Sequence, residues 1–128
     1  MALTQLKSKK KSTGGQYKKS RKKKKRDFGK DFIAVKIGKQ RKKIVRGLGS
    51  SKKQRLLEVE KANVFDGSEK PKVVKILHVE ENPANPHFER MGIVTKGAIV
   101  KTEIGMAKVV SRPGQHGIVN AVLIKEEK

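Results

Sequence analysis

Residues 93–124 read IVTKGAIVKTEIGMAKVVSRPGQHGIVNAVLI and hold three apolar-rich runs separated by glycine. In the first run, 98–104, apolar and polar residues alternate and β-branched residues dominate, as in a half-buried strand. The second run, 106–111, alternates in the same way, whereas the third, 118–124, is apolar on both faces except at Asn120. A strand in the centre of a sheet or barrel has this third pattern. The stretch therefore predicts a β meander.

The loop between the second and third runs, residues 112–117, reads RPGQHG. Proline followed by glycine at the two central positions is typical of a type II turn, whose second central residue has φ > 0. The sequence therefore predicts a structural turn in which Gly114 adopts a positive φ.

Positive charge is concentrated in the first half of the chain. The 128 residues include 33 Lys and Arg and 12 Asp and Glu, a formal net charge of +21. Residues 1–55 hold 22 of the basic and 2 of the acidic residues, a net charge of +20, which leaves +1 for residues 56–128. This asymmetry indicates a polyanionic partner bound by the first half, while the second half has the composition of a neutral globular domain.

The chain contains no cysteine, which excludes disulfide bonds and cysteine-ligated zinc. No apolar run approaches the roughly 20 residues of a membrane span. The positive charges near the N-terminus are not followed by the apolar region of a signal peptide. We therefore expect a soluble intracellular protein with no membrane partner.

Residues 7–26, KSKKKSTGGQYKKSRKKKKR, contain one aromatic residue, Tyr17, and no aliphatic one. The segment has too little to bury to offset the entropy of ordering its backbone, so we expect it to be unfolded in the free protein. A solvated charge run or an import signal is one interpretation, and a nucleic-acid-binding tail is the other. The charge density, a kink at Thr13-Gly14-Gly15 and the stacking capacity of Tyr17 favour the tail.

A second basic region is predicted on ordered structure. Residues 32–37 alternate like a strand, 39–46 continue it as a basic edge strand, and a turn at 47–50 leads to a return strand over about 53–60. A short helix over 50–57 is the competing prediction. The hairpin would display together Lys39, Arg41, Lys42, Lys43, Arg46, Lys52, Lys53 and Arg55.

One more strand is predicted over 73–80, with odd-numbered residues on one face and even-numbered residues on the other. His78 alternates with apolar neighbours, so we expect a partly buried sheet residue rather than a ligand. A turn is expected at 66–68. Two prolines in 82–86 exclude a regular strand or helix there, and a single helical turn near 87–90 leads to the meander.

Enzyme chemistry is not predicted. His78, His87 and His116 lie far apart without metal-ligand spacing, and no glycine-rich run is followed by Lys-Ser or Lys-Thr as in a phosphate-binding loop. A nuclease or RNA-modifying enzyme would need a cluster of catalytic residues. We expect no catalytic residue, no metal site, no cofactor and no small-molecule substrate.

Several motifs occur in a consistent order across nearly the whole chain. They are Thr13-Gly14-Gly15, Arg21-Lys22-Lys23 with Gly29, ENPAN at 81–85, TKGAI at 95–99, and SRPGQ at 111–115 followed by Gly117, Val119, Asn120 and Ala121. With them the chain resembles the archaeal-type small ribosomal subunit proteins of the S-eight-e family. That resemblance implies an antiparallel β-barrel-like core, a basic extended N-terminal region and binding to ribosomal RNA (rRNA).

We therefore expect an all-β protein with a small antiparallel β-barrel-like core over 32–128 and a basic, extended RNA-binding tail over 1–31. The resemblance implies a structural constituent of the small ribosomal subunit in the cytoplasm, supporting subunit assembly and translation. Its partners would be small-subunit rRNA and neighbouring small-subunit ribosomal proteins. The candidate RNA-binding residues are Lys9, Lys10, Lys11, Thr13, Gly14, Gly15, Tyr17, Lys18, Lys19, Arg21, Lys22, Lys23, Lys24, Lys25, Arg26, Arg41, Lys42, Lys43, Arg46, Lys52, Lys53, Arg55 and Arg112.

Two alternatives stay open from the sequence. Arg112 either contacts a phosphate or only belongs to a turn that the fold requires. The chain as a whole has the charge of a free-standing nucleic-acid chaperone or DNA-compacting protein, which would need no particular partner. Co-sedimentation with small ribosomal subunits through a high-salt wash separates this alternative from a ribosomal protein.

Overall fold

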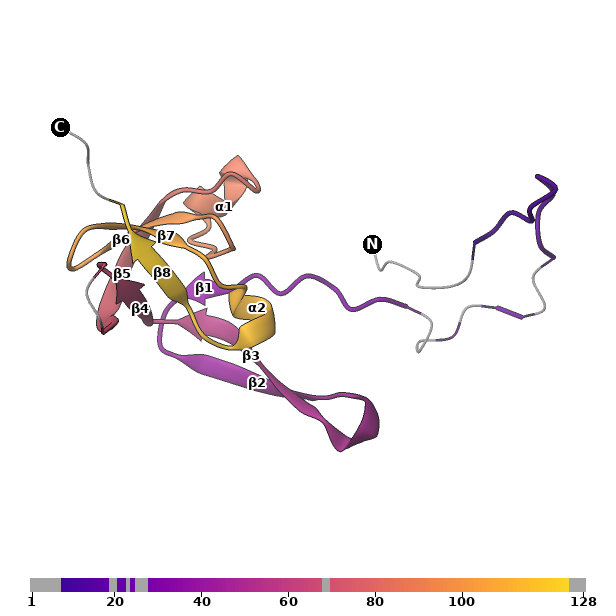
Figure 1. The fold of residues 1–128 in the computed structure, drawn as a ribbon, viewed down its shortest axis with the longest axis horizontal. Helices are drawn as coiled ribbons and strands as arrows, with labels where there is room; N and C mark the ends of the chain where they lie inside the picture. Colours follow the sequence, from indigo (N-terminus) through magenta and orange to yellow (C-terminus); the bar gives the residue numbers. More distant parts are fainter. Residues whose placement is uncertain (1–7, 19–20, 23, 25–27, 68–69, 125–128) are drawn as a thin grey trace. The chain divides into compact units, whose positions relative to one another are not determined.

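The structure is a computed structural model that describes residues 8–18, 21–22, 24, 28–67 and 70–124 (Figure 1). The chain divides into two compact units, residues 1–32 and 33–128. All the strands and helices named below lie in the second unit.

Five strands of the second unit close into a barrel in the order β4-β5-β6-β7-β8 (Figure 1). They are β4 (Lys61–Phe65), β5 (Lys72–Glu81), β6 (Ile99–Thr102), β7 (Met106–Val109) and β8 (Asn120–Leu123). Strands adjacent in sequence pair antiparallel, and a parallel pairing of β4 with β8 closes the barrel. The predicted meander is confirmed as β6, β7 and β8, and so is the all-β class with a barrel core.

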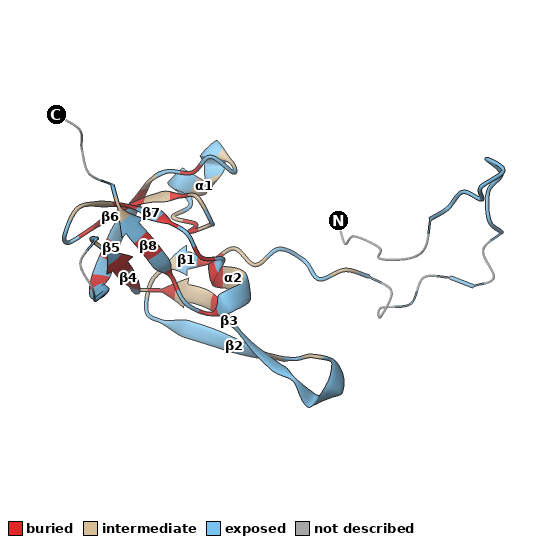
Figure 2. Cartoon of the chain, viewed as in Figure 1, coloured by how far each residue is buried: buried red, intermediate tan, exposed pale blue. Residues whose placement is uncertain are grey.

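Small and β-branched side chains fill the barrel. Val64, Val100, Val109, Ala98 and Ala107 are each at most 1% exposed, and buried residues concentrate in the barrel strands (Figure 2). Successive residues of a strand point to opposite sides, so every strand contributes one inward-facing row. A barrel of few strands is narrow, and valine and alanine fit its interior.

β8 is buried on one face only. Val119 and Ala121 are each 2% exposed, whereas Ile118 and Val122 on the other face are 43% and 44% exposed. A closed barrel covers the inner face of a strand and leaves the outer face to solvent, even where both edges are paired. The prediction that the run 118–124 forms a central or barrel strand is confirmed, because β8 pairs with β4 on one edge and with β7 on the other. Its outer apolar face is exposed to solvent.

The alternation of β5 is interrupted at Leu77. The register of β5 with β6 shifts between Ile76 and His78, so Ile76 and Val79 both face the core at 5% and 4% exposure. His78 is exposed instead, and its Nε2 lies 2.6 Å from Oε1 of Glu80. The predicted partial burial of His78 is therefore wrong, and so is the predicted division into odd-numbered and even-numbered faces. One extra residue in a strand moves the side chains that follow it to the opposite face of the sheet.

Two short elements flank β5. The helix α1 spans Pro86–Arg90, and the side chain of Asn85 accepts a hydrogen bond from the backbone of His87 at its start, which confirms the predicted helical turn. β4 was not predicted. A single residue separates it from β3 (Lys52–Val59), and just two buried side chains, Ala62 and Val64, mark its inner face.

A separate three-stranded sheet has the order β1-β3-β2. β1 (Lys36–Ile37) pairs parallel with β3 (Lys52–Val59), β2 (Arg41–Arg46) pairs antiparallel with β3, and a short 3₁₀ turn, η2 (Leu48–Ser50), forms the tip of the β2–β3 hairpin. The predicted hairpin is confirmed, and the competing helix is wrong. The strand expected over 32–37 shrinks to β1, because the backbone before it bonds to the loop at Val94 instead of to a strand.

The loop 112–117 forms a short helix rather than a type II turn. α2 spans Pro113–His116, and Gly117 ends it with a φ of 75°. Gly114 is not among the residues with positive φ, so the prediction made for it is wrong. A Cβ there would lie 3.4 Å from the carbonyl oxygen of Ile33, at the border of ordinary van der Waals contact.

Ser111 closes the base of this loop. Its hydroxyl donates a hydrogen bond to the carbonyl oxygen of Ile118 (3.0 Å) and accepts one from the backbone N–H of Asn120 (2.9 Å). Ser111 itself is buried. The loop is thus held as a compact unit between β7 and β8.

Candidate nucleic-acid interface

The β2–β3 hairpin presents basic side chains on a surface that is almost wholly exposed (Figure 2). Between residues 32 and 57 the chain has nine Lys and Arg and no acidic residue. Arg41 forms an ion pair with Glu58 at the base of the hairpin (Nη1 to Oε1, 3.5 Å). Of the predicted hairpin residues, Arg41, Lys42, Lys43, Arg46, Lys52 and Lys53 are exposed, and Arg55 is half-buried.

Like charges face each other across this hairpin. The antiparallel register places Lys43 opposite Arg55 and Arg46 opposite Lys52. Directly opposed like charges destabilise a strand pair. The hairpin therefore carries a repulsion that bound anions would relieve.

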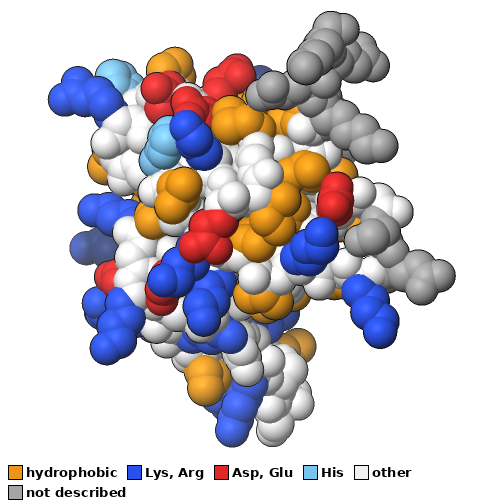
Figure 3. Space-filling model, turned by 90° about the vertical axis from the view of Figure 1, so that its left-hand side faces the viewer, with side chains coloured by type: hydrophobic (Ala, Val, Ile, Leu, Met, Phe, Trp, Pro, Cys, Tyr) orange, Lys and Arg blue, Asp and Glu red, His pale blue; other side chains and the backbone are white. Residues whose placement is uncertain are grey.

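The barrel surface has a different charge pattern. Lys75 lies 3.8 Å from Glu60 and Lys72 lies 3.5 Å from Asp66, measured between the charged nitrogen and oxygen atoms. In Figure 3, acidic and basic side chains are interspersed over much of the visible face, whereas the charged side chains at its lower end are Lys and Arg. Excess positive charge on the second unit is thus concentrated on the hairpin.

In the first unit, residues 9–17 reverse direction around Thr13-Gly14-Gly15. The backbone N–H of Lys11 donates to the carbonyl oxygen of Gly15 (2.7 Å), that of Tyr17 donates to Lys9 (3.0 Å), and Gly14 has a φ of 83°. The ammonium of Lys11 lies 5.9 Å from the centre of the Tyr17 ring. The described part of the predicted tail thus presents lysines on both sides of a glycine turn.

The structure leaves several predicted tail residues without a description. Lys9, Lys10, Lys11, Thr13, Gly14, Gly15, Tyr17, Lys18, Arg21, Lys22 and Lys24 are described, and all of them are exposed. Lys19, Lys23, Lys25 and Arg26 lie outside the described residues.

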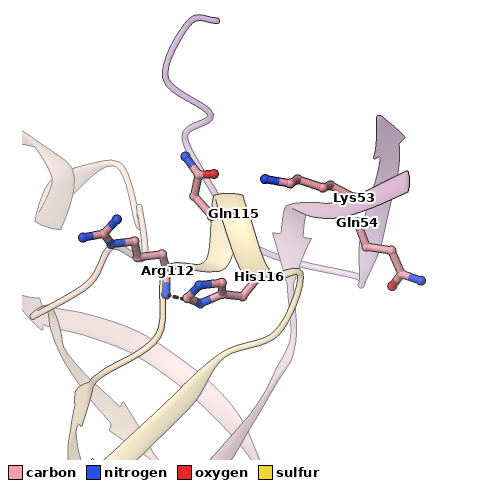
Figure 4. A pocket seen from close by; sticks show the side chains of 5 residues that line it. All are labelled: Lys53, Gln54, Arg112, Gln115 and His116. Carbon is pink, nitrogen blue, oxygen red and sulfur yellow. Dashed lines mark hydrogen bonds between the residues drawn. The ribbon is translucent and has the colours of Figure 1, made fainter. Parts of the chain in front are cut away.

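A hollow of about 360 Å³ lies between the hairpin and α2 (Figure 4). β3 contributes Lys53 and Gln54 to its lining, and the loop 112–117 contributes Arg112, Gln115 and His116. The sequence analysis predicts Lys53 and Arg112, but not the other three, as RNA-binding residues. The only signal for them was that two of the three lie within the RPGQHG motif.

At Gly117 the two walls of this hollow, α2 and β3, approach each other closely. A Cβ at position 117 would lie 3.0 Å from both the Cβ and the carbonyl oxygen of Gln54. The close approach of α2 to β3 therefore favours glycine, which also adopts the positive φ without strain.

The backbone N–H of Arg112 donates to Nδ1 of His116 (3.2 Å) and so closes the α2 turn. The Arg112 side chain lines the hollow. The backbone of Arg112 thus serves the turn, and a contact of its side chain with a phosphate stays a prediction.

Within the described part of the chain, no group of three or more His, Asp or Glu side chains is placed to hold a metal ion. In the same residues, no helix is both long and apolar enough to cross a bilayer. His78, His87 and His116 lie on β5, α1 and α2 respectively.

The fold and charge distribution define a small β-barrel protein with a basic hairpin and a basic N-terminal region. Residues 4–124 match the model of the family described as Ribosomal protein S8e, and the chain belongs to that family. Membership makes it a ribosomal protein rather than an enzyme.

Three relatives named "Small ribosomal subunit protein eS8" are similar over nearly their whole length. The protein from Haloarcula marismortui is 46% identical over 121 residues, covering 94% of this chain and 98% of the relative. That from Methanospirillum hungatei is 47% identical over 122 residues, covering 94% and 98%. That from Methanococcus aeolicus is 48% identical over 128 residues, covering 98% and 100%. These relatives support a structural role in the small ribosomal subunit.

Proposed function

We propose that this protein binds small-subunit rRNA through two basic surfaces, the N-terminal segment of residues 1–31 and the β2–β3 hairpin. By doing so it supports assembly of the small subunit and translation in the cytoplasm, next to other small-subunit proteins. The free-standing chaperone or DNA-compacting protein is disfavoured by membership of a ribosomal protein family.

The like-charged pairs of the hairpin are the observation that carries this proposal. A solvated surface gains nothing from placing Lys43 opposite Arg55 and Arg46 opposite Lys52. A surface that binds phosphates does gain, because each neutralised phosphate releases condensed counterions. The hairpin thus trades some stability of the free protein for affinity to a polyanion.

The two basic surfaces differ in what they contribute. Residues 1–26 hold 12 Lys and Arg and no acidic residue, so they supply mainly salt-dependent affinity. The hairpin is anchored on the buried residues Leu56 and Val59, which are 0% and 1% exposed. A fixed array of charges on β2 and β3 can set the orientation of the protein on an RNA fold.

The test replaces Lys43, Arg46 and Lys52 by Gln in the full chain and measures two quantities. Affinity for purified small-subunit rRNA should fall, and the slope of log K against log salt should become shallower by about 2–3, since up to three phosphate contacts are lost. The free energy of unfolding of the free protein should rise, because two repulsive pairs are removed.

The matched control replaces Lys61, Lys101 and Lys108 by Gln, which removes the same charge from exposed positions on the barrel. This control should change the affinity for rRNA much less than the hairpin variant does. Equal losses from both variants would mean that net charge alone governs binding and would refute a dedicated hairpin surface.

A further inference from the structure

We propose that the hollow between β3 and α2 receives one unpaired nucleotide of the rRNA and contacts both its phosphate and its base. This inference rests on the proposed function, since it assumes that the protein binds rRNA. It adds a place where the sequence of the RNA is read, which the tail and hairpin do not supply. Phosphate contacts position a protein on RNA but carry little sequence information.

The lining has two kinds of chemistry in one small space (Figure 4). Lys53 and Arg112 provide positive charge for a phosphate, and none of the five lining residues is acidic. Gln115 and His116 add hydrogen-bond donors and acceptors, and side-chain amides pair with base edges, whereas the Gln54 amide points away from both of them (Figure 4).

His116 is fixed in one tautomer by the α2 turn. Its Nδ1 accepts a hydrogen bond from the backbone of Arg112, so in the neutral ring the proton lies on Nε2. The ring therefore offers one donor and a flat face. Unstacked bases in single-stranded RNA are held by stacking on such rings and by hydrogen bonds to their edges.

The size of the hollow favours a single nucleotide. About 360 Å³ lies at the low end of the range for small-ligand sites, roughly 300–1,000 Å³. The deep, narrow major groove of an RNA helix hides base edges from side chains, whereas loops and bulges expose them. A nucleotide turned out of a loop or bulge is thus the ligand that matches both the size and the neutral donors.

The backbone segments that carry the lining side chains are held in position. Gly117 lies so close to Gln54 that an added Cβ would be 3.0 Å from the Gln54 Cβ, and Pro113 is buried at the start of α2. Ser111 ties the loop to β8 through two hydrogen bonds. A site that discriminates between bases needs such fixed walls, because its polar groups must meet one edge and not another.

The test uses the full chain, purified small-subunit rRNA and the double variant Gln115→Ala with His116→Asn. Asparagine keeps an acceptor for the Arg112 N–H while it removes the imidazole Nε2 and the ring. The matched control is Gln40→Ala with His87→Asn, two exposed residues outside the hollow. The affinity, its salt slope and a footprint with base-specific reagents for all four bases are measured for each protein.

The double variant should bind about tenfold more weakly, the loss expected for one good base contact, with an unchanged salt slope because no charge is removed. One nucleotide protected by the wild-type protein should become reactive at its base edge. Lys53→Gln should instead make the slope shallower by about 1. The control should match the wild type in all three measurements.

An affinity within twofold of wild type together with an unchanged footprint would overturn the proposal. Loss of protection along both strands of a helix would overturn it as well, in favour of a double-stranded site. The hairpin variant measured in parallel separates this failure from that of the proposed function. If the hairpin variant binds rRNA more weakly than the wild type does, the proposed rRNA binding stands and only the proposed nucleotide site is refuted.

Discussion

Replacing Gly117 by alanine tests how tightly the α2 loop is joined to the basic hairpin. Gly117 has a φ of 75°, which costs a residue with a Cβ about 1–2 kcal/mol. The new Cβ would lie 3.0 Å from the Cβ and the carbonyl oxygen of Gln54, and overpacking of this kind typically costs about 1–3 kcal/mol. Alanine also reduces the entropy of the unfolded chain, which returns about 0.4–1 kcal/mol. We therefore expect a net loss of about 1–5 kcal/mol.

Gly67→Ala is the matched control for this variant. Gly67 has a φ of 78°, and a Cβ there would meet nothing within 4 Å. The two substitutions share the φ strain and the unfolded-state gain, so their difference isolates the contact with Gln54. Gly117→Ala should be the more destabilising of the two by about 1–3 kcal/mol.

The assay is urea denaturation of the full-length variants, in which a shift of midpoint at constant m reports a change in stability. Equal midpoints for the two variants would refute the reasoning, because the close approach of α2 to β3 would then carry no free energy. In a small domain of marginal stability, the expected difference is large enough to measure easily.

Further outcomes follow from the same geometry. Ser111→Ala should cost about 1–3 kcal/mol in urea denaturation, because the hydroxyl bonded to Ile118 and Asn120 is lost, and an unchanged midpoint would contradict its role. Gly114→Ala should cost less than Gly117→Ala, since no positive φ is involved, and the reverse order would contradict this assignment. Deleting residues 1–26 should keep dispersed strand signals in amide spectra while the salt slope of rRNA binding becomes much shallower. If roughly 6–10 phosphate contacts form in the intact protein, its affinity should fall by about 10³–10⁵ between 50 and 200 mM salt. Loss of the fold, or an unchanged slope, would show that the tail and the core are not separable.

The meander could be predicted because its information is local. Alternation with period two and the glycine breaks lie within 93–124, and they correspond to β6, β7 and β8. The basic hairpin was equally accessible, since its strands flank one glycine-rich turn. In both cases neighbouring residues carry the pattern that the fold uses.

Features that depend on distant partners could not be read from the sequence in this way. The shift at Leu77 follows from pairing with β6, and it reversed the expected faces of His78 and Val79. The motif RPGQHG was assigned to a turn with the positive φ at Gly114, whereas the structure has it at Gly117. What singles out Gly117 is its contact with Gln54, more than sixty residues earlier in the chain.

The same contact explains why Gln54, Gln115 and His116 were missed. Each of them alone is an exposed polar residue, and an isolated polar residue carries no signal for binding. They line one hollow only because Gly117 lets α2 lie directly against β3. Lys53 and Arg112 were found by charge, which is visible without any fold.

The close approach of α2 to β3 at Gly117 also bears on the proposed binding to one RNA site rather than to any RNA. Charge alone gives strong binding that does not depend on sequence. Specific placement requires that a charged surface and a base-reading site act at a fixed distance from each other. The hairpin strand β3 supplies a wall of the hollow, and α2, tied to the barrel by Ser111, supplies the other. Separating α2 from β3 should therefore reduce discrimination between RNA sequences more than it reduces total affinity. Gly117→Ala is the variant in which to measure the ratio of its affinities for the specific RNA and for unrelated RNA.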